Sequence, residues 1–547
     1  MKKTIILLNA LMTLSLCASA QQTYNTIEYI DINNINAGHL VHGDMWRNPI
    51  TATAACEYPK GSGKHVATLG SLWLGGYDEM GILRVAAQTY RQQGSDYFPG
   101  PVDMSINTVA AANQHAAKWA RIWKVNRSTI DSFKALTTHT TANTPASILE
   151  WPAKGNTYAK GAQQSALTIS TDMAPFVDVN GDGIYNPLSG DYPKTKGDQM
   201  LWSVFNDYMQ IKGNTQSGNI GLEIQQSVYA YKRGSSVDNM VFYEYNIKNE
   251  GNHILSAFRM GINADMDLGY VFDDYVGFDS SRRMGYVYNA TNPDGLYGAN
   301  IPAAGISIME FPGDNYPALV PAGSFLPYDN VASANGNPAT PIEYNNFLNG
   351  RNRLGNPMHD DRASGTASNA FGSGPTVRYA FPDNPNDLNG WSMCKNAVPY
   401  SDRRFVLGTD SLTFFPGESK KIGMALIVSP DAGACGTLNL AGLQQLSDSA
   451  LIVYYNPPAA LGIHSVKNAA RTLKVYPNPA NDELHILSPD AVDATIRIYD
   501  ASGRQVSALS TNKKSETIVV TSKLAAGMYL VEYRSGETVA NNVFVKE

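Results

Sequence analysis

The fold of this chain is decided by the stretch Leu222-Glu223-Ile224-Gln225-Gln226-Ser227-Val228-Tyr229-Ala230. Apolar and polar residues alternate along it, with Leu222, Ile224, Val228 and Ala230 in phase. Side chains of a β-strand point alternately to the two faces of a sheet, so this period of two indicates a half-buried strand. We therefore expect a β-rich domain with a core on one face of this strand.

The same alternation recurs on both sides of that stretch, at residues 241–248 and 422–428. Few segments have helical spacing. Ser128-Thr129-Ile130-Asp131 resembles a capping box that opens a short helix, and residues 438–454 carry apolar residues at helical intervals. Residues 309–387 are rich in Gly, Asn and Pro and are expected to form long surface loops. The main part of the chain is thus predicted to be a β-sandwich body with few helices.

The first residues have the pattern of a removable signal peptide. Lys2 and Lys3 precede an apolar stretch from Ile5 to Leu16, and Ala18-Ser19-Ala20 offers small residues for cleavage. A lipoprotein anchored through Cys17 is the alternative, but Leu16 is larger than the residue that such anchors place before the cysteine. We expect cleavage after Ala20 and no membrane-spanning segment in the mature chain.

Composition narrows the class of protein further. The chain has 547 residues, only 16% of them charged, and a formal net charge of -6. It has no clustered Lys/Arg stripe of the kind that neutralises phosphates, which argues against nucleic acid as a partner.

Three cysteines remain after cleavage of the signal peptide: Cys56, Cys394 and Cys435. One pair could form a disulfide, and Cys394 with Cys435 is the nearer pair in sequence. Spacing alone does not choose between that pair and three buried thiols.

The last part of the chain is a separate module. It follows a polar linker, residues 456–472, and consists of short alternating runs punctuated by turn residues. These runs are residues 473–475, 483–487, 494–499, 505–509, 516–520, 527–533 and 539–545. About seven short strands at this spacing predict a small immunoglobulin-like β-sandwich over residues 473–547.

Three ordered motifs and the end of this module resemble the type A C-terminal sorting domain of type IX secretion. The residues that carry the resemblance are Tyr476, Pro477, Asn478 and Pro479, then Gly503 within residues 498–504, then Gly527 and Tyr529, and finally Lys546. The resemblance implies a Bacteroidetes protein that the type IX machinery carries across the outer membrane to the cell surface. It also implies removal of the domain in the linker and, in many relatives, attachment to a surface lipopolysaccharide.

The body resembles a group of secreted Bacteroidetes proteins to which no activity is assigned. The matching stretches are residues 72–76, 86–91, 174–193, 263–279 and 402–406. We divide the chain into a signal peptide (1–20), an N-terminal part of the body (21–200), a β-sandwich domain (201–455), the linker (456–472) and the sorting domain (473–547).

One loop has the residue spacing of a calcium site. Asp178, Asn180 and Asp182 fall at alternate positions, Gly183 permits a sharp turn, and the carbonyl of Ile184 would follow as a ligand. An EF-hand would place Glu at the twelfth position, where this chain has Ser189, so we expect an extracellular type of calcium loop closed by Asp191. The alternative is a turn rich in Asx residues that holds no metal.

A second acidic group lies further along the chain. Five carboxylates fall within fifteen residues, and such groups repel one another unless a cation or solvent relieves them. They are Asp265, Asp267, Asp273, Asp274 and Asp279. A second calcium site and a solvated acidic loop are the two main interpretations, and a paired-carboxylate glycosidase site is a third.

Catalytic motifs are scarce. His39, His42 and Asp44 could contribute to a zinc site, but a closed zinc site needs four ligands and the sequence names no others. The chain has no HExxH, GxSxG, Walker A or strand-linked GxGxxG motif. The seven tryptophans could stack on sugars, although aromatic residues more often fill a core.

Three functions follow from these patterns. The first is a calcium-stabilised, non-catalytic surface protein with a structural or adhesive role. The second is a glycan-binding surface protein, which would gather aromatic and acidic residues on one exposed face. The third is a secreted hydrolase that uses acidic residues in a cleft.

Overall fold

The computed structural model describes residues 24–91, 94–208, 212–362, 369–458, 473–488, 492–500, 504–535 and 538–547. The predicted signal peptide, most of the linker and Gly503 lie outside these ranges. The chain divides into two compact units, Met1–Leu461 and Gly462–Glu547. Each unit has its own cluster of buried apolar residues.

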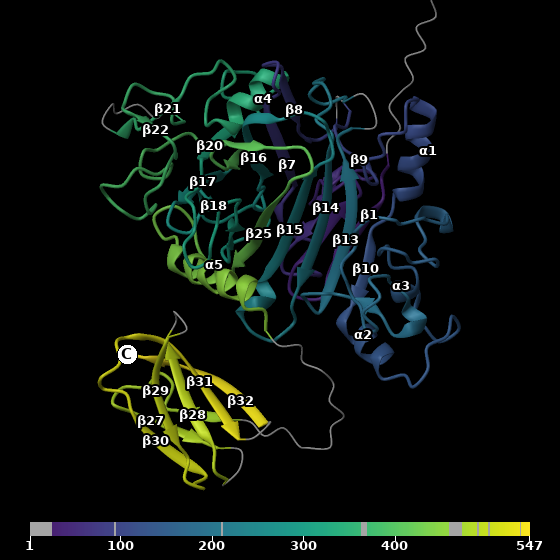
Figure 1. The fold of residues 1–547 in the computed structure, drawn as a ribbon. Helices are drawn as coiled ribbons and strands as arrows, with labels where there is room; N and C mark the ends of the chain where they lie inside the picture. The colour runs from purple at the N-terminus through teal and green to yellow at the C-terminus, as the bar shows by residue number, and fades with distance from the viewer. Residues whose placement is uncertain are drawn as a thin grey trace, which may run out of the picture. The chain divides into compact units, whose positions relative to one another are not determined.

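The body is built on two large antiparallel sheets (Figure 1). Within the described residues, the larger sheet has nine strands in the order β10-β13-β14-β15-β25-β19-β18-β17, with β9 beside β13. Their bounds are β9 (Phe98–Pro99), β10 (Trp123–Asn126), β13 (Gln199–Asn206), β14 (Leu222–Ala230), β15 (Met240–Asn249), β17 (Asp274–Asp279), β18 (Met284–Asn289), β19 (Ala303–Glu310) and β25 (Ser419–Ser429).

The described part of the second sheet has six strands in the order β20-β23-β16-β7-β8, with β24 beside β16. Their bounds are β7 (Leu69–Tyr77), β8 (Leu83–Ala86), β16 (Leu255–Asp265), β20 (Ser324–Asp329), β23 (Arg403–Gly408) and β24 (Leu412–Phe414). Smaller ribbons are β1 (Ile27–Ile30), β2 (Asn36–Leu40), β5 (Cys56–Glu57) and β6 (His65–Ala67) in one sheet, and the pairs β3 (Arg47–Asn48) with β4 (Thr53–Ala54), β11 (Phe176–Val177) with β12 (Tyr192–Pro193), and β21 (Met358–His359) with β22 (Thr376–Val377).

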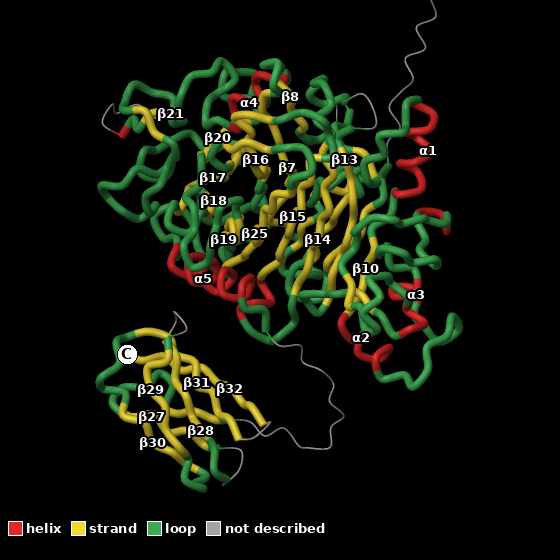
Figure 2. The backbone as a smooth tube through the Cα atoms, in the orientation of Figure 1, coloured by secondary structure: helices red, strands yellow, loops and turns green. Residues whose placement is uncertain are grey.

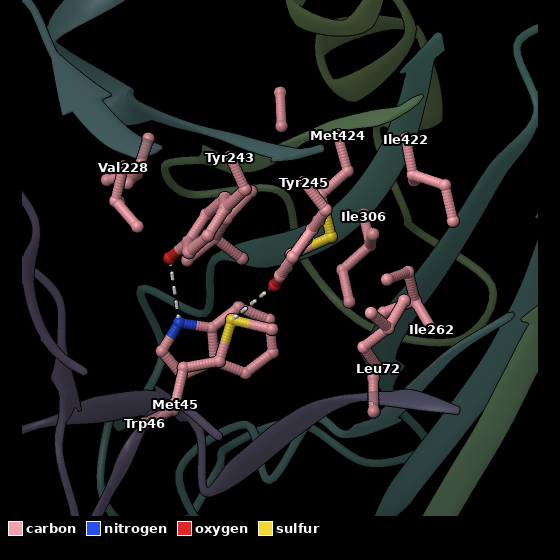
Figure 3. Packing of buried hydrophobic residues seen from close by; sticks show 14 of the residues in the cluster. Met45, Trp46, Leu72, Val228, Tyr243, Tyr245, Ile262, Ile306, Ile422 and Met424 are labelled. Atoms are coloured by element: carbon pink, nitrogen blue, oxygen red, sulfur yellow. Dashed lines mark hydrogen bonds between the residues drawn. The ribbon is translucent and has the colours of Figure 1, made fainter. Parts of the chain in front are cut away.

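The core lies between these two sheets. Figure 3 shows Leu72 and Ile262 of the smaller sheet facing Tyr245, Ile306 and Met424 of the larger one. Within this core the Trp46 indole N–H donates to the Tyr243 hydroxyl at 2.9 Å. All seven tryptophans of the chain are buried. Their expected role in the core is therefore confirmed, and none offers an exposed face to a sugar.

Helices lie at the edges of the body (Figure 2). Within the described residues the α-helices are α1 (Val109–Trp119), α2 (Arg127–Lys134), α3 (Ala146–Leu149), α4 (Pro341–Leu348) and α5 (Leu440–Tyr455). Helix α5 packs on β25 and β19, as the helical spacing of residues 438–454 predicts. The predicted capping box is wrong in detail, because α2 begins after Asn126 and has no side-chain cap.

Two other expectations need correction. Residues 309–387 are not only loops: they include β20, α4, β21 and β22. The division near residue 200 falls inside one unit, because β10 pairs with β13 and β7 pairs with β16 across it.

One disulfide joins Cys394 to Cys435, and Cys56 is free and buried.

The C-terminal unit is a sandwich of seven strands in its described part. One sheet contains β26 (Lys474–Tyr476), β27 (Glu483–Leu487) and β30 (Glu516–Val520). The other contains β28 (Thr495–Asp500), β29 (Gln505–Ser510), β31 (Gly527–Ser535) and β32 (Thr538–Lys546). Alternating residues such as Leu484, Ile496, Val531 and Phe544 fill the space between them.

Candidate functional site

The Asp178 loop connects β11 to β12 and is held by hydrogen bonds to its own backbone. The two oxygens of Asp178 accept from the amides of Gly181 and Gly183, each at 2.7 Å. Asp182 accepts from the amide of Ile184 at 2.8 Å and from the Asn180 side chain at 2.9 Å. The loop therefore has the Asx-rich turn geometry that the sequence offered as one alternative. A carboxylate oxygen has two lone pairs, so this geometry also leaves room for a cation.

Asp191 closes the loop from beneath. It is fully buried, and its oxygens accept from the amides of Val179 and Asn186, each at 2.8 Å. The predicted closing role of Asp191 thus takes the form of backbone hydrogen bonds in this structure.

The second acidic group comes together where β16, β17 and β23 meet. Asp265 is the last residue of β16 and pairs in register with Arg404 of β23. Continuing that antiparallel register places Asp267 opposite Asp402. Oxygens of Asp265, Asp267 and Asp402 all lie within 4.8 Å of one another. We call these three residues, together with Asp274, the acidic centre.

Asp274 joins the acidic centre from the start of β17. Its backbone forms a bridge with Ser401, the residue before Asp402, and its Oδ2 accepts from the amide of Leu268 at 3.2 Å. Asp273 lies beside it and accepts from Asn289 at 3.2 Å and from Thr291 at 2.8 Å.

Asp279 does not belong to this centre, and the sequence-based grouping is wrong there. It lies at the far end of β17, five residues from Asp274 along an extended strand, or about 17 Å at 3.4 Å per residue. It forms an ion pair with Arg282 at 3.0 Å and accepts from Gln444 at 2.8 Å.

Charge in the acidic centre is not balanced by the side chains around it. Asp265 and Asp274 are fully buried and Asp267 is 8% exposed. Arg404 supplies one cation, at 2.7 Å from Asp265 and 3.3 Å from Asp402. The Oδ1 atom of each of the four carboxylates is buried and has no hydrogen-bond partner. An unpaired buried carboxylate oxygen is costly, so this arrangement favours either a bound cation or bound protons.

The pKa values of the acidic centre are displaced in the direction that this imbalance predicts. Burial raises the pKa of Asp265, Asp267 and Asp274, and neighbouring carboxylates raise the pKa of Asp265 and Asp274 further. Tyr90 donates its hydroxyl hydrogen to Asp265, and burial raises the pKa of Tyr90 as well. The hydroxyl of Tyr90 therefore remains a donor at neutral pH.

Sequence reasoning did not place Asp402 in the acidic centre. It lies well over a hundred residues after the other carboxylates, and only strand register brings it to them. The sequence did contain a hint that these segments belong together. The resemblance of the body to its secreted relatives includes residues 86–91, 263–279 and 402–406. These three stretches meet at Tyr90, Asp265 and Arg404.

The candidate zinc residues do not form a metal site in the described structure. His39 and His42 are both buried, but Asp44 forms an ion pair with Arg91 at 2.7 Å. Among the described residues, one group of His, Cys, Asp or Glu side chains has the spacing of metal ligands. It consists of Asp265, Asp267 and Asp402.

Residues of the first sorting motif form hydrogen bonds with the last strand of the C-terminal unit. The Asn478 side chain donates to the carbonyl of Val543 at 3.0 Å and accepts from the amide of Val545 at 2.9 Å. The Tyr476 hydroxyl donates to Glu516 at 2.6 Å, and Pro477 and Pro479 flank Asn478.

The later motif residues complete the same unit. The Tyr529 ring packs 5.3 Å from that of Phe544, and its hydroxyl donates to the carbonyl of Ala525 at 2.8 Å. Gly527 opens β31, and Lys546, which is largely buried, ends β32 and forms a bridge with Ala480.

Residues 474–547 match the family described as the secretion system C-terminal sorting domain. The C-terminal unit is a type IX secretion sorting domain. A chain with this domain is a secreted or cell-surface protein, and the domain implies interaction with the type IX machinery. No helix in the described ranges is long and apolar enough to span a membrane.

Other comparisons add little beyond the sorting domain. No curated protein matches the chain. Among solved structures, a polysaccharide lyase is 9% identical with a TM-score of 0.18, and the match covers 59% of this chain and 34% of the lyase. A putative aldose 1-epimerase from Escherichia coli K12 is 9% identical with a TM-score of 0.21, covering 74% of this chain and 99% of the epimerase. Similarities this low carry no inference about the fold or activity of the body.

Proposed function

We propose that the body is a calcium-stabilised, non-catalytic protein of the cell surface with a structural or adhesive role. The observation that supports this most directly is the acidic centre, where buried oxygens of Asp265, Asp267 and Asp402 converge and Asp274 lies on the neighbouring strand. One oxygen of each of these four carboxylates has no hydrogen-bond partner. Calcium binds six to eight oxygens and tolerates irregular geometry, so it suits a centre that offers carboxylates and neither histidine nor thiolate.

Asp265, Asp267 and Asp402 would hold the ion, with Asp274 beside them. The divalent charge would offset the repulsion that a single Arg404 leaves uncompensated. In this role the ion would join the neighbouring ends of β16 and β17 to β23, which comes from a distant part of the chain. Its contribution would be to the stability of the body.

The Asp178 loop is proposed as a second and weaker calcium position. Asp178, Asn180 and Asp182 present their oxygens at an exposed loop, with the Ile184 carbonyl next in sequence and Asp191 supporting the loop from beneath. Because these oxygens already accept backbone hydrogen bonds, the loop keeps its shape without an ion. Loss of calcium there should affect stability less than loss from the acidic centre.

Thermal unfolding of residues 21–547 with calcium and with EDTA tests this proposal. A ligand at 100 times its Kd adds about 2.7 kcal/mol to the stability of the folded state. We expect EDTA to lower the melting temperature of the body by several degrees. Asp267→Asn should remove this response and, because one repelling charge is gone, should melt higher than the wild type in EDTA.

Asp279→Asn is the matched control, because Asp279 is a carboxylate of the same sequence cluster that lies outside the acidic centre. It should keep the full response to EDTA. Asp178→Asn should keep most of it. A melting temperature that EDTA leaves unchanged in metal-stripped wild-type protein would exclude structural calcium.

Glycan binding is the second candidate, and a specific feature favours it. A polar pocket lies beside the acidic centre and is lined by arginine, asparagine and tyrosine side chains. The hydrolase alternative has less support, since the lining of that pocket contains no carboxylate and the carboxylates of the acidic centre are buried outside this lining.

We also propose that the sorting domain is removed in the linker, residues 456–472, and that the mature body is attached to a surface lipopolysaccharide. The separate cores of the two units support this, because cleavage between them would leave both folded. Mass spectrometry of the surface protein tests it: a mature C-terminus within 456–472 is expected, and an intact residue 547 on the surface protein would contradict removal.

A further inference from the structure

A polar pocket of about 270 Å³ opens beside the acidic centre. A second cavity of about 300 Å³ adjoins it and shares Arg47, Thr89 and Tyr90 in its lining. Tyr90 therefore lines both cavities. The lining comes from β3, β23, α4 and the loops around residues 89, 214 and 330–338, so distant segments of the body converge there.

One wall of the pocket is fixed by a ring of hydrogen bonds. Arg404 donates to the Asn337 side chain at 2.6 Å, and Asn337 donates to Asn330 at 2.8 Å. Asn330 donates to Asp402 at 3.0 Å, and Arg404 also lies 3.3 Å from Asp402. The ring closes on itself, so these side chains are held in place before any ligand arrives.

A second part of the pocket lining is also held by hydrogen bonds. Asn214 is buried, accepts from the Thr89 hydroxyl at 2.8 Å and donates to the Tyr344 hydroxyl at 2.9 Å. Hydroxyls and amides that are fixed in this manner favour a ligand with many hydroxyl groups, because they lose little freedom when it binds.

Arg47 is the group in this pocket whose charge is not compensated. Among the described residues, no carboxylate lies within 4.0 Å of its guanidinium, which instead lies 4.5 Å from the centre of the Tyr90 ring. Arg404 and Arg91, by contrast, are each paired with an aspartate. A free guanidinium beside a preorganised polar wall is suited to an anion, and its planar fork matches a carboxylate.

The backbone before Arg47 is in an uncommon conformation. Trp46 has a φ of 70°, in the left-handed region that residues other than glycine rarely adopt. This turn sends the Trp46 indole into the core, where it bonds Tyr243, while Arg47 lines the pocket. Such strain persists only where the surroundings enforce it, and it is frequent at ligand sites.

We propose that this pocket binds an acidic sugar, with Arg47 bonding the carboxylate and the ring of Asn337, Asn330 and Arg404 bonding hydroxyls. The inference extends the proposed surface role by giving it a ligand class. It rests on the pocket and not on calcium, although Arg404 and Tyr90 also contact Asp265 of the acidic centre.

Binding of small probes to residues 21–547 tests this directly. Glucuronate carries both the carboxylate and the hydroxyls, glucose carries the hydroxyls alone, and acetate carries the carboxylate alone. Ligand-observed NMR at millimolar concentrations, with calcium present, should show glucuronate binding at least tenfold more tightly than glucose or acetate. Arg47→Gln should reduce glucuronate binding at least tenfold and leave the melting temperature and its response to EDTA unchanged.

Arg351→Gln is the matched control, because Arg351 is an exposed arginine on a loop away from the pocket lining. It should bind glucuronate like the wild type. Three results would overturn the proposal: no glucuronate binding, equal binding of glucuronate and acetate, or wild-type binding by Arg47→Gln. An absent EDTA response with intact glucuronate binding would refute the calcium centre and leave the pocket assignment standing.

Discussion

His39 shows how a single buried side chain can set the pH range of the body. It is fully buried, and its ring lies 5.4 Å from that of Tyr243. Burial lowers the pKa of His39 from 6.5 to about 3. Between these values the unfolded chain binds a proton that the folded chain does not, so stability falls as pH falls below 6.5.

Replacing this residue should remove that pH dependence. In His39→Gln the stability relative to the wild type should rise by about 1.4 kcal/mol for each pH unit below 6.5, down to about pH 4. Above pH 7.5 the difference between the two proteins should be constant, which provides an internal control. Urea unfolding at several pH values measures the difference in free energy of unfolding between the two proteins. A difference that does not change from pH 7.5 to pH 4 would contradict the assigned role of His39.

The acidic centre could be predicted from the sequence only in part. Asp265, Asp267 and Asp274 are close in the chain, and their mutual repulsion pointed to a cation or to solvent. Asp279 was grouped with them because sequence distance cannot tell which end of a strand a residue occupies. Asp402 was missed because its place depends on the pairing of β23 with β16.

At the scale of elements, helix α5 depends on a glycine in the strand beneath it. A Cβ atom on Gly423 of β25 would lie 2.3 Å from the hydroxyl oxygen and 2.6 Å from Cζ of Tyr454 in α5. A tyrosine ring in this packing cannot move aside as a flexible side chain can, and its hydroxyl donates to Glu310 at 2.6 Å. Gly423 therefore allows the helix to approach the sheet.

We expect Gly423→Ala to destabilise the body by about 1–3 kcal/mol, the usual range for overpacking a well-filled interior. Gly305→Ala in the neighbouring strand β19 is the control, because its nearest contact is the flexible Met284 side chain at 3.2 Å. Gly305→Ala should lower the free energy of unfolding clearly less than Gly423→Ala does. Equal effects of the two substitutions in thermal unfolding would show that Tyr454 does not limit the approach of α5.

Strands and helices were predicted unequally well. Long strands such as β14 and β15 were evident from their alternation, but the expectation that β14 is half-buried was wrong, because Glu223, Gln226 and Tyr229 on it are buried as well. Helix α4 was not, because Asn and Pro around it suggested loops and the short helix is stabilised by packing on β7 and β8. The cap of α2 was misplaced by two residues, since local sequence sets helix ends only weakly.

At the scale of the whole molecule, the two units have separate cores and separate roles. The β-rich architecture and the terminal sandwich follow from alternation and turn spacing, and the sorting domain follows from its motifs. The body, however, cannot be divided at residue 200, because β10 and β13 share a sheet across it. Pairing between distant strands leaves no signal in a single sequence.

Deleting residues 473–547 should stop transport across the outer membrane and leave a folded body in the periplasm. The body keeps its own core after this deletion, so a loss of surface protein would reflect sorting and not misfolding. Cell fractionation of a type IX host measures it, with the full chain and a periplasmic marker as controls. Normal arrival of the truncated chain at the surface would contradict the assigned role of the domain.

The most direct test of the central claim is to locate the ion. Crystals of the mature chain grown with calcium should give an anomalous difference peak between Asp265, Asp267 and Asp402, with oxygen atoms at about 2.3–2.6 Å. Crystals of Asp267→Asn grown in the same way should lack it. A wild-type map with no peak at the acidic centre, and the four carboxylates holding protons instead, would contradict the account.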